Sequence, residues 1–156
     1  MNAEEKTRYI DVDKIISGSE PGSNLLNQLS IIEKKFITNF KLEDEKFLVE
    51  KNNILSSKNI ITKEEYEKKI LSYQDKLDVY KTKKKDTFKD LKKKRNLEIR
   101  NFLQMINPLI ENYMKNNSIV IILDKKNVFI AKANHDITND IIEIINKNIT
   151  KFKIKE

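Results

Sequence analysis

Apolar residues recur every three, four or seven positions over stretches far longer than the helices of a compact domain. The first stretch carries Leu25, Leu29, Ile32, Phe36, Phe40, Phe47 and Ile54. The second covers residues 63–107, and as a helix it would be about 68 Å long at a rise of roughly 1.5 Å per residue. The core of a 156-residue chain could not surround such a rod. The pattern therefore predicts an antiparallel hairpin of two long helices.

Helix-breaking residues are scarce and concentrated before the first stretch. The chain has two glycines and two prolines, too few for the turns of a many-stranded protein. Gly18, Pro21 and Gly22 fall within five positions, which predicts a change of direction there. Ser23 or Asn24 is expected to cap the first long helix.

The second long helix has a clear predicted start. Thr62 and Glu65 have the spacing of a capping box, in which each side chain bonds the free backbone N–H of the other. We therefore expect the tip of the hairpin near residues 59–61. Pro108 is expected to kink the second helix or to mark a join, because it lacks an N–H and clashes with the preceding turn.

Both ends of the chain have patterns typical of short strands. Residues 8–13 alternate apolar and polar side chains, and the continuous apolar run 119–124 predicts a strand buried on both faces. Residues 128–131 predict a third strand, joined to the second in a β-hairpin. A short helix capped by Asp136 or Thr138 is expected to close the chain. Its apolar side would consist of Ile141, Ile142, Ile144 and Ile145.

These elements predict an α+β protein with a small β body and a helical arm. The body is expected to comprise residues 1–22 and 109–156, and the arm residues 23–108. About 70 residues cannot bury a large core, and three short strands leave open edges. We therefore expect the body to be completed by association with other copies. The residues expected to form this oligomerisation body are Ile10, Val12, Ile119, Ile121, Leu123, Val128 and Ile130.

The positive charge of the chain lies in one part of the arm. Residues 81–100 hold ten basic and three acidic residues, which accounts for the whole formal net charge of +7. Many of these side chains could be solvated or paired with acids such as Glu33. Alternatively, they form a stripe that attracts nucleic acid, an anionic membrane surface or acidic proteins. Nucleic acid is the less favoured partner because Phe88 is the one aromatic residue in the window. The steering candidates are Lys83, Lys84, Lys85, Lys92, Lys93, Lys94 and Arg95.

Aromatic residues are concentrated on the outer half of the arm. Coiled-coil packing between the two helices would account for them. They could also offer adaptable contacts to an unfolded chain, because a narrow apolar stripe holds two helices together weakly. The candidates for binding such a client are Phe36, Phe40, Phe47, Tyr66, Tyr73 and Tyr80.

Composition excludes most enzyme chemistries. Cysteine is absent and His135 is the single histidine, which excludes thiolate catalysis and sites made of several histidines. His135 could join nearby carboxylates in a metal or acid–base cluster, but nothing in their spacing requires them to converge. Those carboxylates are Asp11, Asp13, Asp124, Asp136 and Asp140. Helix capping explains Asp136 and the end of a strand explains Asp124, and this structural explanation is the favoured one. We expect no enzyme, no cofactor and no metal.

The two ends of the chain resemble the Skp/OmpH family of periplasmic chaperones for outer-membrane proteins. The C-terminal match comprises the apolar strand 119–123 with Asp124, the strand 128–131, and Asp136-Ile137-Thr138 opening the last helix. The N-terminal match is RYIDVDKIISGSEPGSNLLNQL, and Pro108 matches a proline where the returning helix re-enters the body.

The resemblance implies more than the residue patterns do. It implies a homotrimer whose strands pool into one small barrel-like body and whose arms enclose a cavity. The clients would be unfolded outer-membrane β-barrel proteins, held without ATP. It also implies a periplasmic location, with the signal peptide absent from the sequence as given, since MNAEEKTRYI lacks an apolar centre. The alternative is a structural or nucleic-acid-binding coiled-coil protein that uses residues 81–100.

Overall fold

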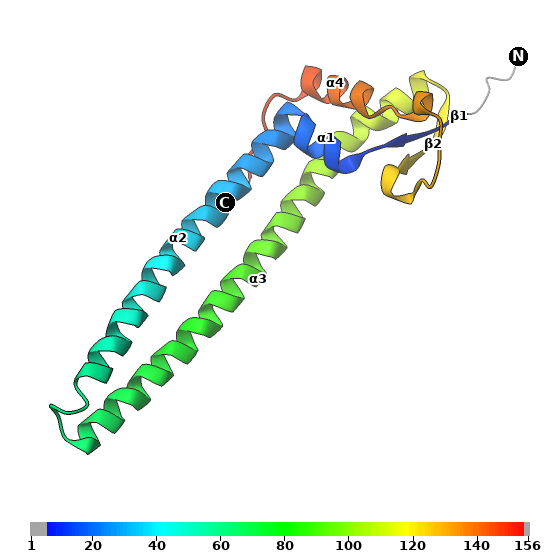
Figure 1. The fold of residues 1–156 in the computed structure, drawn as a ribbon. Coiled ribbons are helices and arrows are strands. Elements are labelled where there is room, and N and C mark those ends of the chain that lie inside the picture. The colour runs from blue at the N-terminus through cyan, green and yellow to red at the C-terminus, as the bar shows by residue number, and fades with distance from the viewer. Residues whose placement is uncertain (1–5, 155–156) are drawn as a thin grey trace, which may run out of the picture. The chain divides into compact units, whose positions relative to one another are not determined.

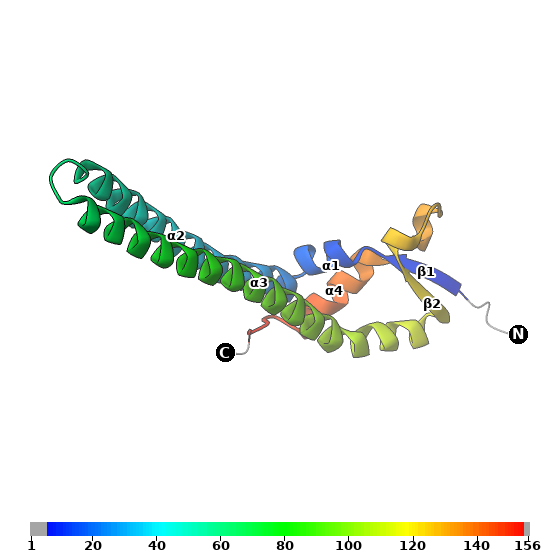
Figure 2. The same cartoon turned by 90° about the horizontal axis from the view of Figure 1, so that it is seen from below.

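The computed structural model describes residues 6–154, and its ribbon is shown from two sides in Figures 1 and 2. The predicted α+β class with a long helical hairpin is confirmed. In chain order the elements are β1 (Lys6–Ile10), α1 (Val12–Gly18), α2 (Glu20–Ser56), α3 (Lys63–Asn116), β2 (Ile119–Asp124), the 3-10 turns η1 (Lys125–Asn127) and η2 (Ala133–His135), and α4 (Thr138–Asn148). The chain divides into a hairpin unit, Ile31–Lys94, and a terminal unit, which is the rest.

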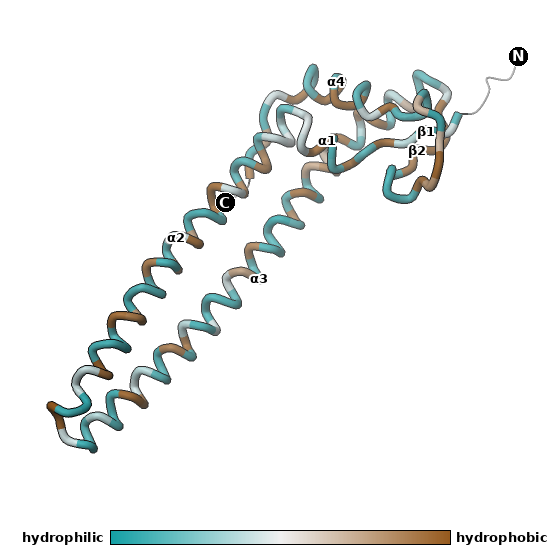
Figure 3. Tube along the Cα trace, in the orientation of Figure 1, coloured by the Kyte–Doolittle hydropathy of each residue, from teal (hydrophilic) through white to brown (hydrophobic). Residues whose placement is uncertain are grey.

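The hairpin unit consists of α2 and α3 lying antiparallel and side by side (Figures 1 and 2). The predicted capping box is confirmed: Glu65 N–H donates to Thr62 Oγ1 and Thr62 N–H donates to Glu65 Oε2, each at 3.2 Å. Figure 3 shows apolar positions recurring along both helices, separated by polar ones. Phe40 and Ile54 are the buried apolar residues of this unit. The apolar stripe therefore has the predicted period and is narrow.

The terminal unit holds the apolar core. The buried residues of that core are Ile10, Ile15, Ile16, Leu25, Leu29, Phe102, Ile106, Ile119, Ile137, Ile141, Ile145 and Phe152. They come from both ends of the chain and from the adjoining turns of α2 and α3. None of the described helices is long and apolar enough to cross a bilayer.

The first strand is shorter than predicted, and a helix follows it. The strand ends at Ile10, because Asp11 caps α1 by accepting the Lys14 N–H at 3.0 Å. Val12 therefore lies in a helix and not in a strand. A single residue, Ser19, separates α1 from α2, and its hydroxyl accepts the Gly22 N–H at 3.3 Å. The predicted cap at Ser23 or Asn24 is therefore wrong.

The sheet has two strands in the described chain. β1 and β2 are parallel, with Thr7 opposite Ile121 and Ile10 opposite Asp124. The predicted third strand and the β-hairpin are wrong, since residues 128–131 form neither strand nor bridge. Extended backbone needs a partner for its N–H and C=O groups, and β2 is paired with β1. β2 is also not buried on both faces, because Val120, Ile121 and Leu123 are 42–50% exposed.

The last helix begins at Thr138 and its N-cap residue is Ile137, so the predicted cap at Asp136 or Thr138 is wrong by one position. The Asp136 carboxylate accepts the backbone N–H of Thr138, the first residue of α4, at 2.9 Å. Ile141 and Ile145 are buried, and Ile142 and Ile144 are half-buried beside them. α3 continues through Pro108 as one helix up to Asn116.

Candidate functional site

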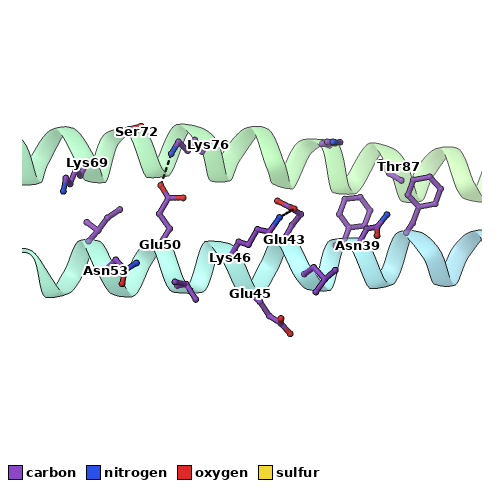
Figure 4. A pocket seen from close by; sticks show the side chains of 16 residues that line it. Asn39, Glu43, Glu45, Lys46, Glu50, Asn53, Lys69, Ser72, Lys76 and Thr87 are labelled. Atoms are coloured by element: carbon purple, nitrogen blue, oxygen red, sulfur yellow. Dashed lines mark hydrogen bonds and ion pairs between the residues drawn. The ribbon is translucent and has the colours of Figure 1, made fainter.

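An open groove of about 1050 Å³ runs along the hairpin unit, between α2 and α3 (Figure 4). α2 contributes most of its lining, including the apolar side chains of Phe36, Phe40, Leu42, Val49 and Ile54. α3 contributes polar side chains, which are Lys69, Ser72, Lys76, Lys83 and Thr87. The apolar side chains of α2 form the floor of the groove. Its rim carries charges of both signs, with Glu43, Glu45, Lys46 and Glu50 on α2 and three lysines on α3.

Aromatic rings hold the two helices together beside the groove. The Phe47 and Tyr80 ring centroids are 4.8 Å apart, and those of Phe40 and Phe88 are 5.6 Å apart. Tyr73 also meets Phe47 edge-on at 6.0 Å. Edge-to-face and tilted pairs at these distances are favourable beyond the area that they bury. Much of the aromatic side chain area is therefore used in joining α2 to α3.

Polar contacts across the hairpin converge on Asp44. Its Oδ2 pairs with Lys84 Nζ at 2.7 Å, and its Oδ1 accepts the Tyr80 hydroxyl at 2.6 Å. The hydrogen bonds from Lys84 and Tyr80 lower the pKa of Asp44. Burial, followed by the hydrogen bond to Asp44, raises the pKa of Tyr80 to about 12. The carboxylate and the phenol therefore stay in their charged and neutral forms through the physiological range.

Lys84 adds a cation–π contact to this network. Its Nζ lies 5.8 Å from the Phe40 ring centroid and 5.7 Å from that of Tyr80, within the distance at which a ring attracts a cation. Nearer the tip, Lys76 bridges the helices by pairing with Glu50 at 2.9 Å (Figure 4). These pairs orient the hairpin more than they stabilise it, because exposed ion pairs contribute little.

The six aromatic residues predicted to contact a client have different surroundings. Phe36 and Phe40 line the groove, and Phe36 remains 36% exposed. Phe47, Tyr73 and Tyr80 pack between the helices, and Tyr66 is half-buried nearer the tip. Phe36 is therefore the most accessible of the rings that line the groove.

The groove also uses aliphatic residues that the aromatic pattern missed. Leu42 and Val49 line it and are 52% and 58% exposed. They lie seven residues apart, so they share one helix face next to the packed stripe. Ile37, Leu48 and Leu55 form a similar exposed row, at spacings of eleven and seven. A second apolar row at helical spacing was the signal that could have identified these positions.

The basic segment is mostly exposed. Lys84 pairs with Asp44, and Lys93 lies 3.8 Å from Asp90. The other steering candidates make no ion pair with any residue between 6 and 154; these are Lys83, Lys85, Lys92, Lys94 and Arg95. Lys83 lines the groove itself. The positive charge of this segment is therefore available to a partner.

A second apolar surface lies on the terminal unit. Besides the exposed side of β2, Phe129 and Ile130 are 102% and 85% exposed in the segment that follows it. Of the residues predicted for the oligomerisation body, Ile10 and Ile119 are buried, Val12 and Val128 are half-buried, and Ile121, Leu123 and Ile130 are exposed. A cavity of about 300 Å³ lies between this segment and β1, with Tyr9 and His135 in its wall.

The aspartates near His135 have structural partners. Asp11 and Asp13 pair with Lys125 and Lys126, at 3.3 and 2.9 Å. Asp124 accepts the Lys126 N–H, and Asp140 accepts the Tyr113 hydroxyl. His135 Nδ1 lies 2.9 Å from the Thr7 carbonyl oxygen. In the part of the chain that the structure describes, no three acidic or histidine side chains are grouped to hold a metal.

This geometry defines a class of protein: a helical hairpin with an open groove that has an apolar floor and a charged rim, joined to a small α/β unit in which β2 has a free edge among the described residues. The profile of the family described as Outer membrane protein (OmpH-like) matches residues 6–145. The chain therefore belongs to the OmpH-like family, as its resemblance predicted.

The fold is shared with a solved structure of this kind. The crystal structure of a candidate outer membrane chaperone (OmpH-like) from Caulobacter crescentus CB15 matches with a TM-score of 0.83 and 16% sequence identity. The match covers 100% of this chain and 92% of that chain. No curated protein matches the sequence.

Proposed function

We propose that this protein is an ATP-independent holdase for unfolded outer-membrane β-barrel proteins in the periplasm. The observation that carries the proposal is the groove of the hairpin unit, in a chain of the OmpH-like family. Three side chains of its apolar floor, Phe36, Leu42 and Val49, are 36–58% exposed although the residues around them are charged. Exposed apolar area of this kind marks an interaction site. An unfolded chain could bind there through many weak contacts, with no nucleotide and no catalytic step.

The basic segment supports a role in attracting the client. Lys83, Lys85 and Lys92 are exposed and unpaired among the described residues. Unpaired charges of one sign accelerate association with oppositely charged partners, and salt screens this effect. Acidic unfolded clients would be attracted first and then held by the apolar floor. An anionic membrane surface would be attracted by the same charges.

The terminal unit supports assembly into a homotrimer. β2 has a free edge in the described chain, and its apolar neighbours Phe129 and Ile130 are almost fully exposed. Strand edges and exposed apolar side chains of this kind are usually covered by association. In the proposed trimer, a neighbouring chain would cover Phe129 and Ile130. Three hairpins would then surround one client.

Suppression of aggregation tests the holdase. An unfolded outer-membrane β-barrel protein is diluted from urea with and without this protein, and light scattering is recorded at several salt concentrations. We expect suppression without ATP. Val49→Asp should weaken it because it places a charge in the apolar floor, whereas Asn52→Asp adds the same charge outside the groove and should not. Lack of suppression at low salt would disprove the holdase.

A charge variant tests steering separately. Replacing Lys83, Lys85 and Lys92 with glutamine should slow client capture at low salt and have little effect at high salt. The matched control replaces Lys34, Lys35 and Lys51, which are also exposed and make no ion pair with described residues. Equal effects of the two triple variants would remove the steering role and leave the groove intact.

Light scattering on a size-exclusion column tests the trimer. We expect the mass of three chains, and Phe129→Ser with Ile130→Ser should shift the protein towards smaller species. A monomer at micromolar concentration would contradict the trimer. Tight, saturable binding of DNA or RNA at physiological salt, together with inactivity towards clients, would favour the nucleic-acid-binding alternative.

A further inference from the structure

The segment after α4 binds to a site on the terminal unit that Gln28 of α2 and Phe102 of α3 form. We call this site the Gln28–Phe102 seat. Residues 149–154 have no regular secondary structure, but Phe152 is 8% exposed. Its ring meets the buried Phe102 ring edge-on, with the centroids 5.8 Å apart and the planes at 79°. An aromatic side chain outside any helix or strand is thus inserted into the core.

Gln28 binds the backbone of this segment in two places. Its Nε2 donates to the Phe152 carbonyl oxygen at 2.5 Å, and its Oε1 accepts the Ile154 N–H at 3.2 Å. Asn24 Oδ1 accepts a second hydrogen bond from the same Nε2 at 2.8 Å, which fixes the orientation of the amide. One side-chain amide therefore satisfies the C=O of one residue and the N–H of the residue two positions later.

This mode of binding recognises an extended chain more than a particular sequence. The hydrogen bonds go to backbone atoms, so they do not depend on the side chains of the bound segment. The apolar contacts select among bound segments. They favour an aromatic residue at the position of Phe152 and an aliphatic one at the position of Ile154. Lys151 and Lys153 between and beside them are exposed.

The sequence of the segment resembles a β-strand that is apolar on one face. Residues 151–154 read Lys-Phe-Lys-Ile, so apolar and polar side chains alternate. In an extended chain, residues two positions apart lie on the same face. The strands of membrane β-barrels alternate in the same way and carry aromatic residues at their ends. The segment thus has the pattern of the proposed clients.

We propose that the Gln28–Phe102 seat is a binding site for extended peptide segments with an aromatic residue two positions before an aliphatic one. The C-terminal segment of the chain is its occupant in cis, and a strand of an unfolded client replaces it. That the replacing strand comes from an unfolded outer-membrane protein rests on the proposed function. Displacing the segment would break the two hydrogen bonds to Gln28 and the packing of Phe152 and Ile154 against the core, and a client strand of the same pattern would form these contacts in their place.

Peptide binding to the full-length protein tests the seat. The probe is a fluorescein-labelled peptide of sequence NITKFKIKE, followed by anisotropy. Phe152→Ala in the full chain removes the anchor of the cis occupant, so the peptide should bind this variant at least about tenfold more tightly than it binds the unaltered protein. Adding Gln28→Ala should abolish the gain. A peptide with alanine in place of phenylalanine is the matched control and should not bind.

The outcomes separate this site from the holdase. Lack of binding to a folded Phe152→Ala variant, checked by circular dichroism, would overturn the seat, and so would equal binding to variant and unaltered protein. If Phe152→Ala unfolds, Ile154→Ala gives the same comparison, because it loosens the segment without removing a ring from the core. Peptide binding without suppression of client aggregation would disprove the holdase and leave the seat standing.

Discussion

The Tyr80 hydroxyl on α3 lies 2.6 Å from Oδ1 of Asp44 on α2, across the hairpin. The same hydroxyl is 3.0 Å from the backbone carbonyl oxygen of Phe40. Tyr80 thereby joins an apolar contact, with Phe47, to a polar one at the same level of the two helices. Phe40 and Ile54 are the buried apolar residues among those of the hairpin unit, so half-buried contacts such as that of Tyr80 with Phe47 also hold its helices in register.

Removing this hydroxyl should destabilise the hairpin. We expect Tyr80→Phe to lower the free energy of unfolding by about 1 kcal/mol, since it deletes a hydrogen bond and keeps the ring. Urea titration followed by circular dichroism measures the change. Tyr66→Phe is the matched control, because the Tyr66 hydroxyl has no hydrogen-bond partner among residues 6–154, and it should change the free energy little. Equal effects of the two variants would contradict the assigned role of Tyr80.

The stability that the Tyr80 hydroxyl contributes should decrease at alkaline pH. The pKa of Tyr80 is raised from 10.0 to about 12 in the folded protein. A raised folded-state pKa contributes stability that is fully present below pH 10 and is lost as pH rises towards 12. The difference in urea midpoint between the unaltered protein and Tyr80→Phe should therefore persist at pH 8 and shrink between pH 10 and 12. The variant should also lack one phenolate absorbance step near pH 12.

The two glycines should respond differently to alanine. A Cβ on Gly22 would lie 2.1 Å from the Ile16 carbonyl oxygen, because the first turn of α2 is packed against the backbone of α1. A Cβ on Gly18 would meet only the flexible end of Ile142, at 3.3 Å. Gly22→Ala should cost roughly 2 kcal/mol or more of stability, and Gly18→Ala should be close to neutral. Thermal unfolding of the two variants measures this contrast, and similar melting temperatures would refute it.

Replacing Ser118 with glycine should stabilise the protein. It joins α3 to β2 with a φ of 55°, the one non-glycine residue with positive φ in the described chain. A side chain in this region costs roughly 1 kcal/mol, so Ser118→Gly should stabilise the terminal unit by up to about that amount. Ser118→Val should destabilise it, because β-branched residues fit this conformation worst. Chemical denaturation of the three proteins should give the order glycine, serine, valine.

Much of the helical hairpin could be predicted because its signals are local. The apolar stripe of Leu25 to Ile54 repeats every turn or two of one helix, the Thr62–Glu65 capping box spans four residues, and both are confirmed. Which aromatic residues line the groove and which pack between the helices could not be predicted in this way. Phe36 and Phe47 lie eleven residues apart in the same apolar stripe, but the partner helix decides that one lines the groove and the other packs against Tyr80.

The sequence by itself determined the long helices, the closing helix and the family, since periodicity, caps and short motifs act over neighbouring residues. Only the tertiary structure decided that β1 pairs with β2, that residues 128–131 are not a strand and that Phe152 enters the core against Phe102. The physical reason is distance along the chain. A backbone group or an apolar ring far from its partner in sequence takes a conformation that depends on which partner the rest of the fold brings to it.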